Sequence, residues 1–170
     1  ASDTSPNPFN SVRVAFGLML PTGFQSDGSA WNSLWDLHYP NDGPAQSPMT
    51  ASIINGNELW YRVLGGPLTP DGTMGSVRFF EKVATLAHGV YYELQHDILH
   101  DPVAGVFDVW VDGIPVCAYN GPTISPGKPN STYWKQGFYR PANTSGTQSY
   151  FFKDTLCWYQ PGPAAMLEGG

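Results

Sequence analysis

The chain has 170 residues, 41% of them hydrophobic and 14% aromatic, so it can bury a sizeable core and is not a disordered chain. Its net charge of −6, with only 8 Lys and Arg, argues against a nucleic-acid partner, because nucleic-acid binders need a basic surface to neutralise phosphates. No apolar run reaches the roughly 20 residues of a membrane-spanning helix, so we expect no membrane span. The missing initiator Met before Ala1 indicates a processed or trimmed start.

Alternation of apolar and polar residues, the period of a β-strand, recurs along the chain, whereas helical spacing is soon interrupted by Gly or Pro. The predicted strands, in chain order, are 12–20, 31–38, 49–54, 58–64, 77–86, 90–99, 106–111, 114–119, 133–140 and 150–159. Asn55-Gly56 and Asp112-Gly113 favour tight hairpin turns. The pattern predicts one all-β domain over residues 1–170, two antiparallel sheets in a jelly-roll sandwich, with residues 1–10 and 160–170 as tails.

Strand 133–140 has an unusual polar face. Tyr133, Lys135, Gly137 and Tyr139 share that face by parity. A cation and two phenols around a glycine gap suit a polar ligand on an open sheet better than a core. A strand that simply faces solvent is the alternative interpretation. In strand 31–38 the same rule puts Trp35 and Leu37 on one face and Asp36 and His38 on the other.

Other residues admit two interpretations each. Trp60 and Trp110 lie on the polar faces of their strands, where they would stack on sugar rings or form the rim of the core. Cys117 and Cys157 are either bridged or two separate thiols. His96 and His100 have a spacing that suits zinc on a helix, but they lie at the end of a strand, so we expect no metal site and no cofactor.

Three segments together resemble one group of enzymes. The run from Tyr133 to Arg140, Tyr-Trp-Lys-Gln-Gly-Phe-Tyr-Arg, resembles the Tyr-x-Lys-x-Gly-x-Tyr-Arg signature of the jelly-roll polysaccharide lyases, which include heparin lyase I, glucuronan lyase and alginate lyase families. Residues 88–113 are similar to the long hairpin before that signature, and Trp35-Asp36-Leu37-His38 resembles the families' Gln-x-His strand. The resemblance implies a concanavalin A-like sandwich, a polysaccharide partner and an extracellular or surface-exposed location.

The resemblance also implies residue roles. These lyases cleave uronic-acid glycans by β-elimination, with a His and a Tyr transferring protons. His38 matches that His, Tyr139 the Tyr, and Lys135 a signature Lys whose charge would favour the ionised phenol. The remaining carbohydrate-binding candidates are Tyr133, Asp36 and Arg140, together with Trp110 and Trp60, which strand parity singled out. We expect Lys135, Tyr139 and His38 to project into one concave groove.

Two departures from the family pattern bear on activity. Asp36 stands where the families have Gln, and a carboxylate about 4 Å from a uronate costs about 4 kcal/mol at an effective dielectric near 20. The families' earlier strand with Arg and Glu has no counterpart, since Arg13 is followed two positions later by Ala15 rather than Glu. Three functions therefore remain open: a glycan-binding or adhesion module, an active lyase, and a structural or decoration domain of a virion, tail or cell-surface assembly.

Overall fold

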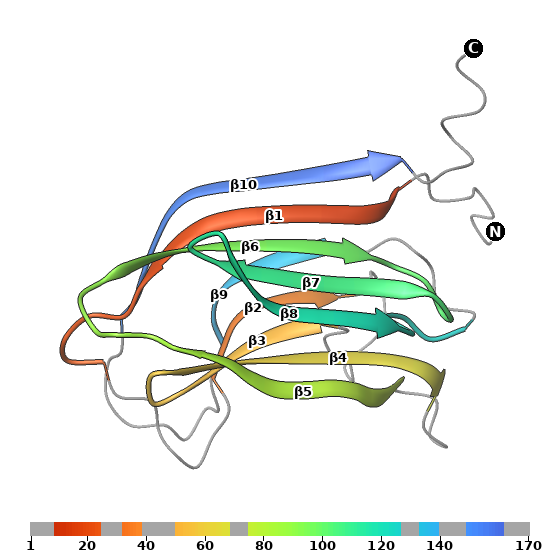
Figure 1. Ribbon diagram of the computed structural model, residues 1–170, viewed down its shortest axis with the longest axis horizontal. Coiled ribbons are helices and arrows are strands. Elements are labelled where there is room, and N and C mark those ends of the chain that lie inside the picture. Colours follow the sequence, from red (N-terminus) through yellow and green to blue (C-terminus); the bar gives the residue numbers. More distant parts are fainter. Residues whose placement is uncertain are drawn as a thin grey trace.

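The computed structural model describes residues 9–24, 32–38, 50–68, 75–126, 133–139 and 149–161. These residues form ten strands (Figure 1). The strands are β1 (Phe9–Met19), β2 (Asn32–His38), β3 (Thr50–Asn55), β4 (Glu58–Leu68), β5 (Gly75–Thr85), β6 (Tyr91–Leu99), β7 (Gly105–Val111), β8 (Ile114–Gly121), β9 (Tyr133–Tyr139) and β10 (Phe151–Pro161). Each corresponds to a strand expected from the alternation. In this part of the chain no helix is long and apolar enough to cross a membrane.

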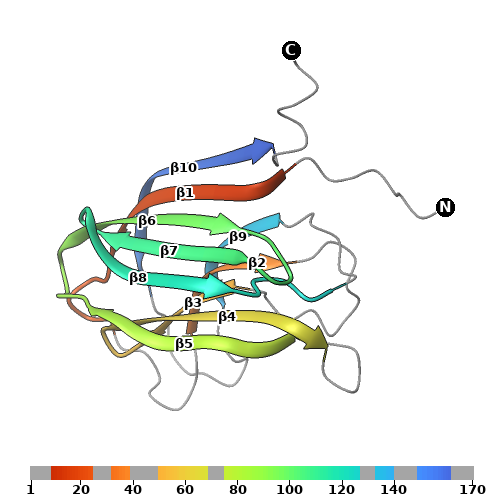
Figure 2. The same cartoon turned by 45° about the vertical axis from the view of Figure 1, so that its right-hand side comes forward.

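The strands form two five-stranded antiparallel sheets that face each other (Figure 2). Sheet A has the order β10-β1-β6-β7-β8 and sheet B the order β5-β4-β3-β2-β9. The predicted two-sheet jelly-roll sandwich is therefore confirmed. The expected tails, residues 1–10 and 160–170, overlap the strands. β1 begins at Phe9 and β10 continues to Pro161, and these two residues are paired.

The hairpin turns follow from residues that tolerate positive φ. At the β7–β8 turn, Asp112 and Gly113 have φ values of 51° and 75°, as a two-residue turn of the expected kind requires. At the β3–β4 turn, Asn55 pairs with Glu58, so Gly56 forms the loop together with Asn57 and not with Asn55. These tight turns keep consecutive strands adjacent within each sheet.

The core lies between the two sheets and contains the residues that parity assigned to the inner faces. From sheet A these include Val12, Val14, Phe16, Leu18, Phe107, Val109 and Val111, and from sheet B Trp35, Leu37, Leu59, Tyr61 and Val63. Leu34 is buried as well, although it is adjacent to Trp35, at the irregularity in the pairing of β2 between Ser33 and Trp35. The inward position of Trp35 and Leu37 confirms the predicted faces of β2. It follows that Asp36, between them, belongs to the outer face of sheet B.

One polar pair bridges the two sheets inside this core. The Tyr61 hydroxyl of β4 lies 2.6 Å from Nε2 of His96 on β6, and Nδ1 of His96 lies 3.3 Å from the Val14 carbonyl oxygen. Because a carbonyl only accepts, Nδ1 bears the proton, and Nε2 accepts from the Tyr61 hydroxyl. The His96 ring packs against Phe16 and Trp35. This pair satisfies two buried polar side chains and fixes the alignment of sheet A on sheet B.

A glycine pair on β4 closes one end of the sandwich. The Gly66 amide donates to the Ile124 carbonyl at 3.0 Å, which ties β4 to the segment after β8. Gly66 has a φ of +70°, and a Cβ there would lie 1.9 Å from a guanidinium nitrogen of Arg78. Arg78 in turn donates to the Gly65 carbonyl at 3.0 Å. The close approach and the backbone conformation both require glycine at position 66.

Candidate functional site

The outer face of sheet B has a row of five residues, three of them charged, that runs across all five strands. Backbone pairing places Lys135 opposite Asp36, Asp36 opposite Ala51, Ala51 opposite Arg62, and Arg62 opposite Phe80. Directly opposed residues of antiparallel strands point to the same face. We call these five residues the charged row. Because Ala51 lies between them in the register, Asp36 and Arg62 are separated by one strand.

Asp36 and Arg62 form the centre of the charged row. Asp36 is only 5% exposed, and its Oδ1 accepts a hydrogen bond from the Ser33 hydroxyl. Arg62 is half-buried, and within the described part of the chain its Nε has no hydrogen-bond partner. Burial lowers the pKa of Arg62, and the charge of Asp36 opposes that shift. The guanidinium stays protonated, so a buried cationic donor is left for an anionic ligand.

At the β5 end of the charged row, Phe80 forms an aromatic pair with Trp60. The rings of Trp60 and Phe80 are 5.3 Å apart at an interplanar angle of 30°, and Phe80 is 50% exposed. The indole nitrogen of Trp60 donates to Glu58 Oε2 at 3.2 Å, and Lys82 Nζ donates to Glu58 Oε1 at 3.0 Å. The hydrogen bond from Lys82 is the main reason that the pKa of Glu58 is lowered. These contacts hold the Trp60 ring in place on the outer face of the sheet.

The predicted residues of β2 and β9 share this sheet, with a register that pairs His38 with Tyr133 and Ser33 with Tyr139. Tyr139 thus lies opposite a position five residues from His38 along β2, a backbone separation of roughly 16 Å at 3.3 Å per residue. The side chains of His38, Tyr133 and Tyr139, and all of Arg140, lie outside the described residues. That His38 and Tyr139 meet in one groove stays a prediction, and the backbone puts Tyr133 nearer to His38.

Lys135 and Gly137 are both exposed on β9. In the described part of the protein, no atom lies within 4 Å of the place where a Cβ on Gly137 would be. The glycine gap that the sequence predicted on this face of β9 is therefore open to solvent beside Lys135.

Trp110 and Arg13 do not belong to the charged row. Trp110 lies on β7 of sheet A, where it is half-buried and pairs with Gln95, so it is on a different sheet from Trp60. Arg13 lies on β1 of sheet A and forms two hydrogen bonds with the Asp97 carboxylate, Nε to Oδ1 being 2.6 Å. The charge of Arg13 is therefore paired with Asp97 on sheet A, on the opposite side of the sandwich from the charged row.

The structure also decides the status of the cysteines and histidines. Cys117 is buried on β8 and Cys157 exposed on β10, at opposite edges of sheet A, so the disulfide between them that the sequence left open is not formed. His96 and His100 are buried four residues apart along an extended strand and its end. Among the described residues no group of three or more His, Cys, Asp or Glu side chains is placed to hold a metal ion.

The candidate site residues predicted from the sequence did not include Arg62, Phe80 or the Glu58–Lys82 pair. Glu58, Trp60 and Arg62 alternate along one strand, so the parity that singled out Trp60 also places Arg62 on the same face. Phe80 had no such signal, because its position opposite Arg62 depends on the β4–β5 register, which contains irregularities. Parity within a strand was sufficient for Arg62, whereas pairing between strands was needed for Phe80.

Comparison with known proteins agrees with the fold. A fungal endo-β-1,4-glucuronan lyase from Trichoderma reesei superimposes with a TM-score of 0.66 and 17% identity over 89% of this chain and 66% of its own. An alginate lyase of polysaccharide lyase family 7 gives 0.61 and 18% over 91% and 64%. An alginate lyase from Pseudomonas aeruginosa gives 0.56 and 12% over 90% and 66%. No curated protein matches the sequence.

Each of these enzymes is longer than this chain, which spans 64 to 66% of their lengths. At such identities the superpositions establish the fold alone. The model of the polysaccharide lyase family matches residues 5–155, which include the whole charged row and every strand except the second half of β10. By that match, the chain belongs to the polysaccharide lyase family.

Proposed function

We propose that the outer face of sheet B binds an acidic polysaccharide and that the chain acts as a glycan-binding module. The observation behind this proposal is the charged row, in which Arg62 lies next to the Trp60–Phe80 pair and Lys135 lies at the other end. Aromatic faces stack on pyranose rings, and cations neutralise uronate carboxylates. The row crosses four strand spacings, roughly 19 Å, which suits an oligosaccharide segment better than a single sugar.

Asp36 modifies the electrostatic argument made from the sequence. Its carboxylate still opposes a uronate, but it lies between Arg62 and Lys135 in the register, so the row has one net positive charge. The Ser33 hydroxyl also donates a hydrogen bond to the Asp36 carboxylate. A uronate near β9 would meet Lys135, and one near β4 would meet Arg62, so Asp36 would weaken the binding without preventing it.

Binding of alginate and polyglucuronate oligosaccharides, followed by isothermal titration calorimetry, tests this proposal. Arg62→Ala should weaken binding at least tenfold, because it removes the half-buried cation, whereas Arg62→Lys should retain part of the affinity. Arg13→Ala is the matched control, since it removes an arginine from the opposite sheet. If Arg62→Ala binds as tightly as the wild type, or if Arg13→Ala loses as much, the charged row is not the binding site.

An active lyase is the second candidate, and family membership together with the β2–β9 register favours it. His38, Tyr133 and Lys135 occupy neighbouring backbone positions on these strands. In β-elimination the uronate carboxylate is neutralised, a base removes the C5 proton, and an acid protonates the departing O4, which leaves an unsaturated sugar. Both proposals include an extracellular or surface-exposed location, because the relatives are polysaccharide lyases. The virion or tail role has no support among the relatives described above.

Ultraviolet absorbance of unsaturated uronates during incubation with alginate, glucuronan and heparin tests the lyase proposal. Tyr139→Phe and Tyr133→Phe form a matched pair, because both phenols lie on β9 and only one of them is opposite His38. A rise in absorbance that either variant abolishes establishes a lyase and identifies its phenol. A flat trace from a wild-type protein that binds these glycans leaves the binding module as the function.

A further inference from the structure

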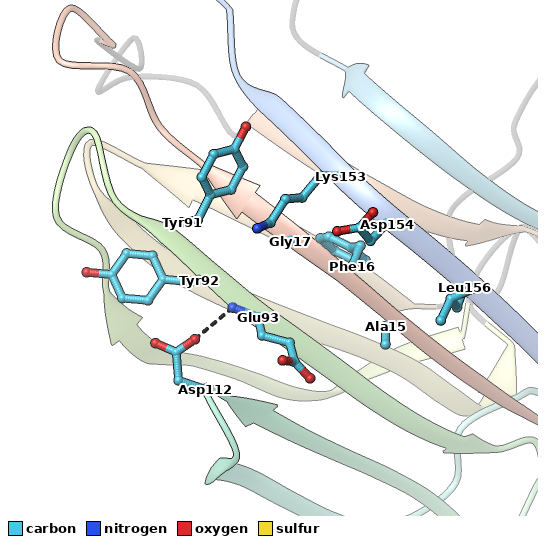
Figure 3. Close-up of a pocket in the computed structure, with 10 residues that line it drawn as sticks. All are labelled: Ala15, Phe16, Gly17, Tyr91, Tyr92, Glu93, Asp112, Lys153, Asp154 and Leu156. Atoms are coloured by element: carbon cyan, nitrogen blue, oxygen red, sulfur yellow. Dashed lines mark hydrogen bonds between the residues drawn. The ribbon is translucent and has the colours of Figure 1, made fainter.

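The outer face of sheet A has a hollow of its own, far from the charged row in the sandwich. Its cavity volume is about 410 Å³. It lies along β1, the strand between β10 and β6, where the outward-facing residues Ala15 and Gly17 are small and the core residue Phe16 between them also lines the hollow (Figure 3). Larger side chains rise on both sides, Tyr91 and Glu93 from β6 and Lys153 and Leu156 from β10. We call this hollow the β1 trough.

Lys153 crosses the β1 trough because Gly17 has no side chain. A Cβ on Gly17 would lie 2.6 Å from Cγ and 2.8 Å from Cε of Lys153. The lysine thereby reaches Tyr91, with Nζ 4.6 Å from the centre of the phenol ring. Among the described residues this ammonium has no carboxylate within ion-pair distance. Its three N–H donors are therefore available to a ligand at one end of the trough.

Carboxylates supply acceptors on both sides of the trough. Asp112 is fixed to β6, because its Oδ1 accepts from the Glu93 amide at 2.7 Å and its own amide donates to the Glu93 carbonyl at 2.8 Å. Glu93 stays exposed beside it, with Oε1 accepting from Gln95. On the other side Asp154 is exposed and has a φ of 52°. No described residue donates a hydrogen bond to the Asp154 carboxylate.

A bulge in β10 gives the trough its shape. Ala15 pairs with Leu156 and Gly17 with Lys153, so two steps along β1 correspond to three along β10. The extra residue turns the strand locally and brings both Lys153 and Leu156 over β1. The trough thus combines an aliphatic side chain, a phenol, an ammonium and carboxylates around a floor without bulky side chains.

We propose that the β1 trough binds a neutral oligosaccharide, as a second glycan site that goes beyond the acidic-glycan site proposed for sheet B. Sugar hydroxyls both donate and accept, so they can use the Lys153 ammonium together with the Glu93 and Asp154 carboxylates. Leu156, 54% exposed, and Tyr91, 42% exposed, offer apolar surface to the C–H faces of pyranose rings. Three carboxylates against one ammonium repel a uronate, so this site selects uncharged sugars. The two faces of the sandwich then bind two classes of polysaccharide.

Calorimetric titration with cellopentaose, mannopentaose and xylopentaose tests the proposal. Tyr91→Ala removes the exposed ring, and Gly17→Ala raises the floor and displaces the flexible Lys153 side chain. Each should weaken binding of the preferred neutral sugar at least tenfold. Lys153→Met, which keeps the length and removes the charge, should weaken it less than Tyr91→Ala. Trp60→Ala on sheet B is the control and should leave neutral-sugar binding unchanged.

The outcomes separate this proposal from the one for sheet B. The proposal is wrong if none of the three neutral sugars binds, or if Tyr91→Ala and Gly17→Ala bind like the wild type while Trp60→Ala does not. Loss of acidic-glycan binding in Trp60→Ala, with neutral-sugar binding intact, supports both sites. Neutral-sugar binding that depends on Tyr91, in a protein that binds no acidic glycan, supports the β1 trough and refutes the acidic-glycan site.

Discussion

The buried Tyr61–His96 pair predicts how the stability of the protein depends on pH. Burial lowers the pKa of His96 from 6.5 to about 3, while the hydrogen bond to Val14 and the charge of Asp97 oppose this shift. In the unfolded chain the pKa is about 6.5. Between pH 3 and pH 6.5, His96 is protonated in the unfolded chain but neutral in the folded protein. The contribution of neutral His96 to the free energy of unfolding is therefore fully present above pH 6.5 and decreases as the pH falls towards 3.

The size of this effect follows from the shift. Lowering the pH from 6.5 to 4 spans about 2.5 units, which at 1.36 kcal/mol per unit removes about 3 kcal/mol of folding free energy through His96 alone. Burial also lowers the pKa of His100 to about 4, which adds a loss of the same sign. For a protein with a typical stability of about 5–15 kcal/mol, these losses are large.

Two variants isolate the contribution of His96. His96→Phe removes the acceptor of the buried Tyr61 hydroxyl and should cost about 1–3 kcal/mol at pH 7. Tyr61→Phe combined with His96→Phe removes both polar groups and should recover much of that cost. In urea unfolding from pH 7 to pH 4, both variants should lose about 3 kcal/mol less than the wild type. An equal loss in the wild type and the double variant would refute this reasoning.

Three further results are expected. Gly66→Ala should lower the free energy of unfolding by about 1–2 kcal/mol in urea titrations, because alanine at a φ of +70° is strained and its Cβ would meet Arg78; unchanged stability would contradict the tight approach. Arg13→Ala should cost only about 0.2–1 kcal/mol, since its side chain is 57% exposed and its ion pair with Asp97 is screened by salt; a larger loss, unaffected by salt, would contradict this. Asp36→Asn, which can still accept from the neighbouring hydroxyl, should bind acidic oligosaccharides severalfold more tightly in calorimetry, and unchanged affinity would remove Asp36 from the account of the site.

The fold was predictable from local alternation to a large extent. Every predicted strand exists, and the inward faces of β1, β2 and β7 follow directly from parity because a residue between two core positions must point outwards. His96 was considered from the sequence only as a zinc ligand. Its parity with Leu94 and Ile98 puts it in the core, where Tyr61 from the other sheet makes its burial tolerable. That partner is 35 residues away and has no local signal.

The candidate site was less predictable, because it depends on contacts between residues that are distant in the sequence. Parity placed Asp36, Trp60 and Lys135 on outer faces, but it gives no information about which sheet a strand joins or which residues it faces. Trp60 and Trp110 looked equivalent in the sequence and lie on different sheets. The β1 trough was invisible from the sequence, because it arises from small residues on one strand and a bulge on another that only pairing brings together.

The position of β1 has a consequence for how the protein folds. β1 lies between β6 and β10, and Val12 pairs with Ile98 on one side and with Tyr159 on the other. Sequence separations of this size make the pairing slow, because most of the chain must be ordered to close the loop. During synthesis on the ribosome, β1 therefore has an unpaired edge until residue 159 has emerged. That interval is when the nascent chain is most exposed to strand exchange and aggregation, so binding by a chaperone would protect β1 most.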